Sequence, residues 1–239
     1  MSGHIVKSYD NEFAILDRMT SEMGGLAETL LRDAFDALER RDPRLAEKSV
    51  ASDRVIDELE RDLQERAILL IAKRQPMAND LRHVMTVLKI ASDLERIGDL
   101  AKNIAKRALA VSGESHPKPL IAGLRHLSET AQRQLKDVLD ALGAQDADKA
   151  VAVWRSDKNL DALYTSVFRE LLTYMMEDPR KIGLCTHLLF GAKNLERIGD
   201  HTTNIAENIY FLVTGKVLPD DRPKGDDTSS AVFLSRPMV

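Results

Sequence analysis

The sequence predicts an all-α protein built from two tandem three-helix bundles that are related by pseudo-two-fold symmetry. Aromatic residues make up only 5% of the 239 residues, a low content for β-sandwiches and β-barrels, whose strands favour them. Apolar residues instead recur at steps of three and four over long stretches, the spacing of one face of a helix. An internal repeat then divides the helical pattern into two similar halves.

The repeat is a run of six identical residues. Leu-Glu-Arg-Ile-Gly-Asp occurs at 94–99 and again at 195–200. The match continues with Asn-Ile-Ala at 103–105 and at 204–206, so the offset is constant at 101 residues. This agreement is too long to arise by chance, and it indicates a duplicated unit.

Each half contains three apolar-periodic stretches separated by helix-breaking residues. In the first half the breaks fall at Asp42-Pro43, Gln75-Pro76 and Ser112-Gly113. Pro43 suits the first turn of the following helix. In the second half the same reasoning predicts helices over 120–142, 147–176 and 179–213.

The expected domains follow from these breaks. We expect a first repeat over residues 1–113, a second repeat over 114–215 and a flexible C-terminal tail over 216–239. The run His-Pro-Lys-Pro at 116–119 is the expected link between the repeats. The tail has lost its apolar periodicity and carries a proline- and aspartate-rich run at 219–225.

Composition excludes several classes of function. The formal net charge is −4, which gives no sign of the basic face that nucleic-acid binding needs. Cys185 is the only cysteine, so an intrachain disulfide and a cysteine-based metal site are excluded. No apolar stretch approaches the ~20 residues that span a bilayer, and no signal peptide is visible. We therefore expect a cytoplasmic protein.

Carboxylates interrupt the apolar stripe of the third helix. Leu88 and Ala91 lie on this stripe, and the next step of four reaches Glu95. Asp99 and Asn103 follow at steps of four, so that three oxygen-bearing side chains form a column on or beside the inner face. The sixth helix repeats this column with Glu196, Asp200 and Asn204.

The second helix of each half carries an acidic pair beside its own apolar stripe. These pairs are related by an offset of 104 residues: Asp53 with Asp57, and Asp157 with Asp161. When neighbouring helices pack antiparallel, the pairs face the column, and burying several carboxylates requires positive charge nearby. Oxygen-rich clusters suit Mg²⁺, Ca²⁺, Mn²⁺ or oxidised iron. The pattern leaves three interpretations open: a metal site, buried salt bridges between helices, and a solvated surface.

The other residues near the motif give weaker signals. Gly98 and Gly199 cost helix stability, which points to close packing of a neighbouring helix or to room for a metal ligand. His201 either adds a nitrogen ligand or faces solvent. The chain has no Glu-x-x-His, the spacing that ferritin-type di-iron bundles use.

The doubled motif resembles the PhoU family. The resemblance extends to Met-Gly-Gly-Leu at 23–26 and to the run at 75–82, and it covers the chain from about Phe13 to Gly215. It implies a negative regulator of the phosphate starvation response and of phosphate uptake. By the same resemblance, the partners are the ATP-binding subunit of the phosphate-specific ABC transporter and a sensor histidine kinase, which the protein links as a non-enzymatic adaptor.

The resemblance also implies bound metal, with iron, zinc, manganese or magnesium as the expected ions. The ligands that it implies are Asp53, Asp57, Glu95, Asp99, Asp157, Asp161, Glu196 and Asp200, with Asn103 and Asn204 as further candidates. Asp93 is replaced by Asn194 in the second half, so we expect the second site to be weaker or differently occupied.

Two other functions stay open from the sequence. One is a metal-dependent enzyme that uses paired ions, and the other is a regulator of a different phosphate permease. We also expect a homodimer, because long amphipathic helices often leave an apolar strip exposed. Contact with a membrane is expected only through partner proteins.

Overall fold

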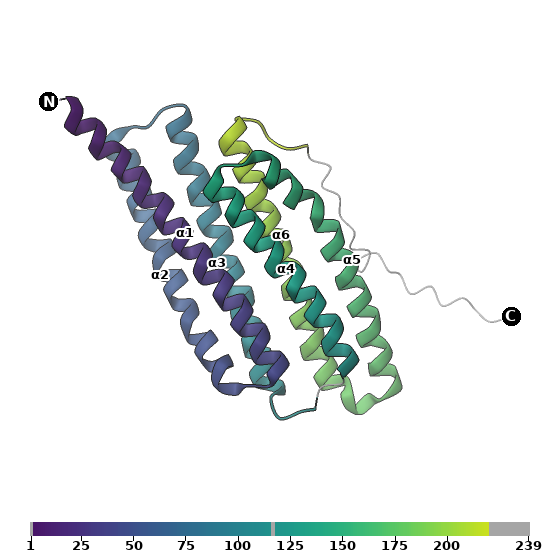
Figure 1. The fold of residues 1–239 in the computed structure, drawn as a ribbon. Coiled ribbons are helices and arrows are strands. Elements are labelled where there is room, and N and C mark those ends of the chain that lie inside the picture. Colours follow the sequence, from purple (N-terminus) through teal and green to yellow (C-terminus); the bar gives the residue numbers. More distant parts are fainter. Residues whose placement is uncertain (1, 116–117, 220–239) are drawn as a thin grey trace.

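The computed structural model describes residues 2–115 and 118–219, and within these residues the chain is helical and contains no strand. Figure 1 shows two groups of three long helices lying side by side. The first half comprises α1 (Ser2–Arg40), α2 (Pro43–Arg74) and α3 (Asn79–Val111). The second half comprises α4 (Lys118–Ala144), α5 (Ala147–Glu177), a 3₁₀ turn η1 (Pro179–Lys181) and α6 (Ile182–Thr214). The predicted all-α class is confirmed.

The same turn leads into the second helix of each half. Asp42 and Asp146 are the N-cap residues, with nearly identical backbone angles of φ −96° and ψ 100°, and φ −97° and ψ 102°. Each follows a residue in the left-handed region, Arg41 at φ 57° and Gln145 at φ 50°. The two turns lie 104 residues apart, the offset that also relates the acidic pairs. The duplication is therefore visible in the backbone as well as in the sequence.

The helix predicted over 179–213 begins differently from its expected form. Asp178 caps the turn by accepting the backbone N–H of Arg180, and Pro179 starts a 3₁₀ turn. The α-helix proper begins at Ile182 and ends at Thr214, and its C-cap residue Gly215 has a φ of 71°, in the left-handed region. Glycine adopts this conformation without steric cost, which explains the sharp end of α6.

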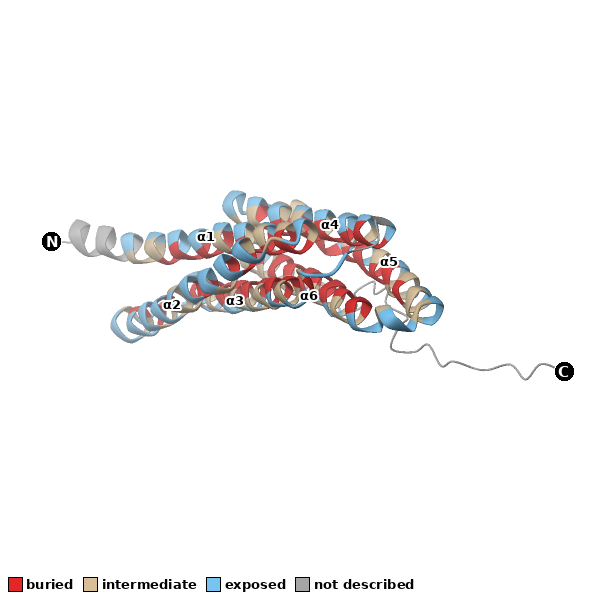
Figure 2. Ribbon diagram, turned by 90° about the horizontal axis from the view of Figure 1, so that it is seen from below, coloured by how far each residue is buried: buried red, intermediate tan, exposed pale blue. Residues whose placement is uncertain are grey.

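α3 and α6 occupy the centre of the molecule. α3 packs against α1, α2 and α6, and α6 packs against α3, α4 and α5. The buried side of each helix faces the other helices, as the view from below in Figure 2 shows. The buried apolar residues form one core that runs through both halves. The contact of α3 with α6 is the main one that joins the halves, and α1 with α4 forms the other.

α3 and α6 run antiparallel to each other. The Arg82 guanidinium lies 5.5 Å from the centre of the Phe211 ring, and that of Arg107 lies 4.8 Å from the centre of the Phe190 ring. Between these contacts, Ile97 and the equivalent Ile198 come opposite each other, and both are fully buried. The pseudo-two-fold axis therefore passes through the middle of the two repeated motifs.

The buried residues of both halves belong to one core, so packing marks no boundary between the two repeats. The repeat boundaries at residues 113 and 215 therefore stay a prediction. His116 and Pro117 of the expected link lie outside the described residues. So does most of the expected tail, from residue 220 to 239. Of the described tail residues, Leu218 packs against the core.

Candidate metal centres

The first acidic cluster consists of Asp53, Asp57, Glu95 and Asp99, and it lies where α2 packs on α3. Asp53 is only 2% exposed, whereas Glu95 and Asp57 are half-buried. Gly98 permits the close approach of the two helices. A Cβ atom there would lie 3.1 Å from Asp53 Oδ1 and 3.0 Å from Ile56 Cδ1. Close packing is therefore sufficient to explain this glycine.

Lys102 joins the two helices across the first acidic cluster. Its Nζ donates a hydrogen bond to Asp53 Oδ2 on α2 and another, of 2.5 Å, to Asp99 Oδ1 on α3. The lysine side chain is only 20% exposed. Burial works to lower the pKa of Lys102, but the bonds to Asp53 and Asp99 outweigh it and raise that pKa. The ammonium therefore stays charged between the two carboxylates.

Burial also affects the carboxyl groups of the first acidic cluster. Burial raises the pKa of Asp53, the Lys102 hydrogen bond opposes this shift, and the charges of Asp57 and Asp99 add to it. Burial raises the pKa of Glu95 as well, with a further contribution from the charge of Asp99. The Lys102 ammonium and, at Glu95, the exposed Arg96 guanidinium 3.6 Å away partly compensate the negative charge of the cluster.

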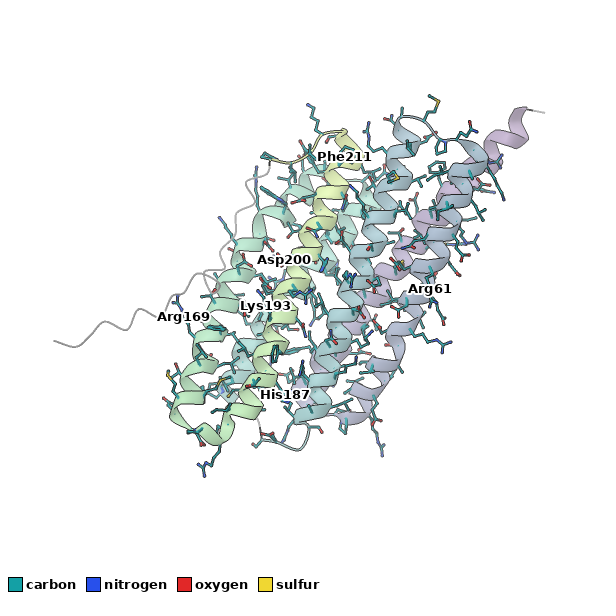
Figure 3. The ribbon with its side chains drawn as sticks, turned by 180° about the vertical axis from the view of Figure 1, so that it is seen from behind. Arg61, Arg169, His187, Lys193, Asp200 and Phe211 are labelled. Carbon is teal, nitrogen blue, oxygen red and sulfur yellow. The ribbon has the colours of Figure 1, made fainter. Side chains whose placement is uncertain are left out.

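The second acidic cluster consists of Asp157, Asp161, Glu196 and Asp200, and it lies where α5 packs on α6. It is more deeply buried than the first. Asp157, Asp161 and Glu196 are 1%, 4% and 6% exposed, and Asp200 is half-buried. Figure 3 labels Asp200 and Lys193, which lie along the middle of α6.

The lysine of the second acidic cluster comes from the other end of the motif. Lys193 Nζ donates to Glu196 Oε1 at 2.9 Å and lies 4.9 Å from the centre of the Tyr164 ring. Its side chain is 40% exposed, twice as much as that of Lys102. The position equivalent to Lys102 is Thr203, whose hydroxyl donates to the backbone oxygen of Gly199 at 2.9 Å.

Two buried acceptors near the second acidic cluster have no hydrogen-bond donor. One is Glu196 Oε2, and the other is Gln134 Oε1 on α4. Leu160 Cδ2 packs directly on Gly199 at the place of a Cβ atom, and Asp157 Oδ1 and Gln134 Oε1 lie 3.4 and 3.5 Å from the same place. Burial raises the pKa of Glu196, the hydrogen bond from Lys193 opposes the shift, and the charges of Asp200 and Asp161 add to it.

The two asparagines of the predicted ligand set are placed differently from the carboxylates. Asn204 Nδ2 donates to Asp93 Oδ1 at 3.2 Å, and His201 Nδ1 lies 2.9 Å from the same oxygen. Both contacts cross from α6 to α3. The replacement of Asp93 by Asn194 therefore changes the contact between the halves and not a carboxylate cluster. Asn103 is partly buried on α3.

The donor types fit a hard cation, but the side chains are not drawn together around one. Among residues 2–115 and 118–219, no group of three or more His, Cys, Asp and Glu side chains has a geometry that would hold a metal ion. Carboxylate oxygens are nevertheless the ligands that Mg²⁺, Mn²⁺ and oxidised iron prefer. Each cluster also contains one buried carboxylate oxygen without a hydrogen-bond donor, Asp53 Oδ1 in the first and Glu196 Oε2 in the second, where a cation would satisfy an unpaired acceptor.

The sequence analysis missed Lys102, Lys193 and Gln134. The sequence does contain a sign of Lys102, because the two copies of the repeat differ between the identical runs at 94–99 and 103–105. Leu-Ala-Lys at 100–102 stands opposite His-Thr-Thr at 201–203. A lysine on one side of an otherwise identical acidic motif indicates a different balance of charge. Gln134 lies on another helix, and nothing in the sequence relates it to the motif.

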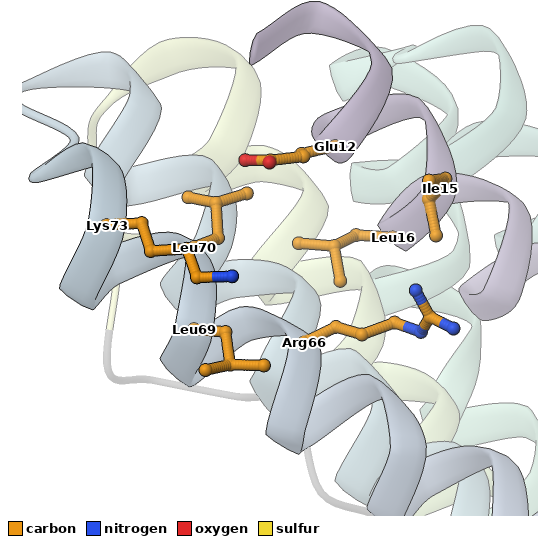
Figure 4. A pocket seen from close by; sticks show the side chains of 7 residues that line it. All are labelled: Glu12, Ile15, Leu16, Arg66, Leu69, Leu70 and Lys73. Atoms are coloured by element: carbon orange, nitrogen blue, oxygen red, sulfur yellow. The ribbon is translucent and has the colours of Figure 1, made fainter. Parts of the chain in front are cut away.

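A pocket lies apart from both acidic clusters, between α1 and α2 (Figure 4). Its volume is about 140 Å³, and its lining residues are Glu12, Ile15, Leu16, Arg66, Leu69, Leu70 and Lys73. Arg74 donates two 3.2 Å hydrogen bonds to Glu12 at its edge. The pocket contains no residue of the repeated motif.

In the part of the chain that the structure describes, no helix combines the length and the apolar character that a bilayer span requires.

Comparison with known proteins gives the same assignment from sequence and from structure. Proteins from Rhizobium meliloti and Caulobacter vibrioides, both described as phosphate-specific transport system accessory protein PhoU homologs, are 54% and 50% identical to this chain. Each alignment covers 95% of this chain, and 96% and 98% of the respective relative.

Solved structures agree with these relatives. PhoU from Pseudomonas aeruginosa matches with a TM-score of 0.84 and 38% identity, covering 87% of this chain and all of the other. The phosphate transport system regulatory protein PhoU from Streptococcus pneumoniae matches with a TM-score of 0.81 and 27% identity, covering 88% and 99%. The family model described as the PhoU domain matches twice, over residues 20–108 and 124–209. The chain belongs to the PhoU family.

Proposed function

We propose that this protein is a negative regulator of the phosphate starvation response and of phosphate uptake. It acts as an adaptor between the ATP-binding subunit of the phosphate-specific ABC transporter and a sensor histidine kinase. When phosphate is ample, it holds this assembly in its inhibitory state. The proposal places the protein in the cytoplasm, at the membrane only through its partners, and away from nucleic acid.

One observation carries the proposal: the chain is 54% identical, over 95% of its length, to a relative named as an accessory protein of phosphate-specific transport. A full-length match at this identity supports the same role. The site supports an adaptor more than an enzyme, because the carboxylates of both clusters lie at helix–helix contacts, where a substrate has little access. Docking on partners is then the means of action.

The surface of the first half supplies apolar residues for docking. Ile68 and Leu69 on α2 are 62% and 51% exposed, and Met77 in the following loop is 80% exposed. Exposed apolar side chains that lie close together are typical of surfaces that bind other proteins. We propose that this surface contacts a partner subunit or a second copy of the chain, which accounts for the expected homodimer.

We further propose that the acidic clusters bind a metal ion with a regulatory or structural role. Asp53, Asp57, Glu95 and Asp99 would hold it in one half, and Asp157, Asp161, Glu196 and Asp200 in the other, with iron, manganese, magnesium or zinc as the candidates. Bound metal would supply positive charge between two packed helices. The chain's own carboxylates would then hold α2 against α3 and α5 against α6. Elemental analysis of protein purified without chelators tests this part.

Pull-down experiments test the adaptor role. Tagged protein is recovered from cells grown with ample phosphate and from phosphate-starved cells, and the transporter and kinase subunits are quantified. We expect both partners to be recovered when phosphate is ample. An Ile68→Asp and Leu69→Asp double variant should lose at least one of them, while Ile182→Asp, the same change at an exposed site of the second half, retains both. Recovery of neither partner with ample phosphate would contradict the adaptor role.

A further inference from the structure

The pocket between α1 and α2 has an apolar floor and a charged rim (Figure 4). Leu16 and Leu70 form the floor and are 1% and 3% exposed, while Ile15 and Leu69 line the pocket nearer to solvent. The volume of about 140 Å³ suits one apolar side chain, because cavities of about 150 Å³ admit a benzene-sized group. The pocket is therefore large enough to receive an anchoring Leu or Phe side chain of another polypeptide.

The rim of the pocket carries two cations to which the protein supplies no counter-charge. The Glu12 carboxylate accepts two 3.2 Å hydrogen bonds from Arg74, which neutralises it. Arg66 and Lys73 are exposed on α2, and neither forms an ion pair with another residue of the described ranges. A guanidinium and an ammonium group thus stand beside an apolar pocket, both available to carboxylates from outside.

The second half shows that the fold does not require these cations. Buried residues of α2 recur on α5 at the offset of 104 residues, for example Ala67 at Leu171. At this offset the residues along the pocket correspond as follows: Arg66 to Glu170, Leu69 to Thr173 and Lys73 to Glu177. The same edge of the bundle is therefore built with the opposite charge and without the exposed leucine. Since packing imposes neither the basic rim nor that leucine, both indicate a role in binding.

We propose that this pocket is the docking site for an acidic amphipathic helix of a partner protein. The inference rests on the adaptor role of the proposed function. The partner helix lies along the groove between α1 and α2, inserts one apolar side chain into the pocket and pairs two carboxylates with Arg66 and Lys73. These two residues are seven positions apart on α2, about 10.5 Å along the helix axis. The matching helix carries Asp or Glu two turns apart, with Leu or Phe between them.

The mixed character of the pocket selects this occupant. A small inorganic anion gains nothing from the apolar floor, and a wholly apolar segment leaves Arg66 and Lys73 without carboxylates. An apolar anchor between two carboxylates satisfies both parts of the pocket. Opposite charges across the contact also speed association and exclude partners of the wrong charge.

Binding of the purified full-length protein to each purified partner tests the inference. The partners are the ATP-binding subunit and the full-length kinase in detergent, and the Kd is measured by isothermal titration at low and at high salt. For one of them, we expect Arg66→Glu with Lys73→Glu to raise the Kd about tenfold or more at low salt, because repulsion replaces two ion pairs. This loss should shrink at high salt, which screens exposed charges.

Two further variants separate the pocket from its charge. Ile15→Trp fills the pocket without changing the charge and should weaken binding of the same partner at both salt concentrations. Leu69→Ala removes part of the apolar lining and replaces that variant if the tryptophan protein does not fold. Arg133→Glu with Arg169→Glu makes the same change of charge at exposed sites of the second half and is the matched control, which should bind as wild type.

Other outcomes overturn the inference. If the variants of the pocket bind both partners as tightly as wild type does, the docking site is wrong and the adaptor role stands. Equal weakening by Arg133→Glu with Arg169→Glu would show that only the overall charge matters. If neither partner binds the wild-type protein, the adaptor role fails and the inference falls with it. If the charge variant of the pocket loses only self-association in sedimentation, or only binding to phosphatidylglycerol vesicles, the occupant is a second copy or a membrane instead.

Discussion

The first and second acidic clusters contain the same six-residue motif, but the lysine that pairs with their carboxylates comes from a different position in each. On α3, a buried lysine after the motif bridges Asp53 and Asp99. On α6, a half-exposed lysine before the motif contacts Glu196. Each cluster keeps one buried carboxylate oxygen without a donor, Asp53 Oδ1 in the first and Glu196 Oε2 in the second. Both halves retain the glycine that allows the close helix contact. The duplicated unit thus conserves its backbone packing, while the position of the compensating charge has diverged.

The largest expected effect concerns Lys102. Lys102→Met retains the packing of the stem but leaves Asp53 buried without its ammonium, so we expect metal-free protein to lose about 2–4 kcal/mol of unfolding free energy. Urea unfolding followed by circular dichroism measures the loss. Lys106→Met, an exposed change on the same helix, should leave the unfolding midpoint unchanged. A loss below that of an ordinary surface substitution would show that Lys102 does not balance the first acidic cluster.

The opposite sign is expected in the second acidic cluster. Glu196→Gln removes a buried charge and places an amide N–H₂ beside Asp161 and Asp200, so metal-free protein should gain about 1–2 kcal/mol at neutral pH. Glu95→Gln should gain less, because the Glu95 side chain is 20% exposed. Unfolding in urea with a chelator present compares the two variants. Equal gains in unfolding free energy for the two variants would show that the two glutamates are buried at the same cost.

The pH dependence of the same variant sharpens that comparison. Burial raises the pKa of Glu196 above the ordinary value of 4.5, so the folded protein holds this proton more tightly than the unfolded chain does. The stabilising contribution of the protonated form is complete below the ordinary value and is lost as the pH rises through the raised one. The advantage of Glu196→Gln should therefore shrink from about pH 7.5 to about pH 4.5. An advantage that grows on acidification would contradict this.

The contact between the halves gives a smaller expected effect. Asp93→Ala removes the acceptor of Asn204 and His201, which should cost about 1–2 kcal/mol through two lost hydrogen bonds. Asn194→Ala, at the equivalent place in the second half, should cost less. The two unfolding free energies are measured side by side. Equal costs would show that the contact is symmetric, and a larger cost for Asn194→Ala would show that Asn194 and not Asp93 carries it.

The smallest difference is expected where the halves are most alike. Asp42→Ala and Asp146→Ala each remove an N-cap and should each cost about 1 kcal/mol. Asp42 accepts two backbone N–H groups and Asp146 accepts one, so Asp42→Ala should cost slightly more. Thermal unfolding of both variants checks this. Costs that differ by more than the loss of one hydrogen bond would show that the two turns are not equivalent.

Local signals in the sequence are sufficient to predict the fold class, the duplication and the family. Apolar steps of three and four, helix breaks at Pro43 and Pro76 and a six-residue identity at an offset of 101 are local signals that need no coordinates. The turn at Asp42-Pro43 was also predicted, because proline suits the first turn of a helix and interrupts the preceding one. Even the placement of Glu95 and Glu196 against neighbouring helices followed from periodicity.

Only the tertiary structure decided which charges meet. Whether Asp53 faces a metal ion or an ammonium depends on the rotation of α3 against α2, and that rotation is set by packing around Gly98 and Ile56 over a distance that periodicity does not encode. In the same way, Asn204 contacts Asp93 of the other half because α3 and α6 cross antiparallel at the pseudo-two-fold axis. Partners of a buried charge are chosen by three-dimensional proximity, and one sequence read along its length does not contain that information.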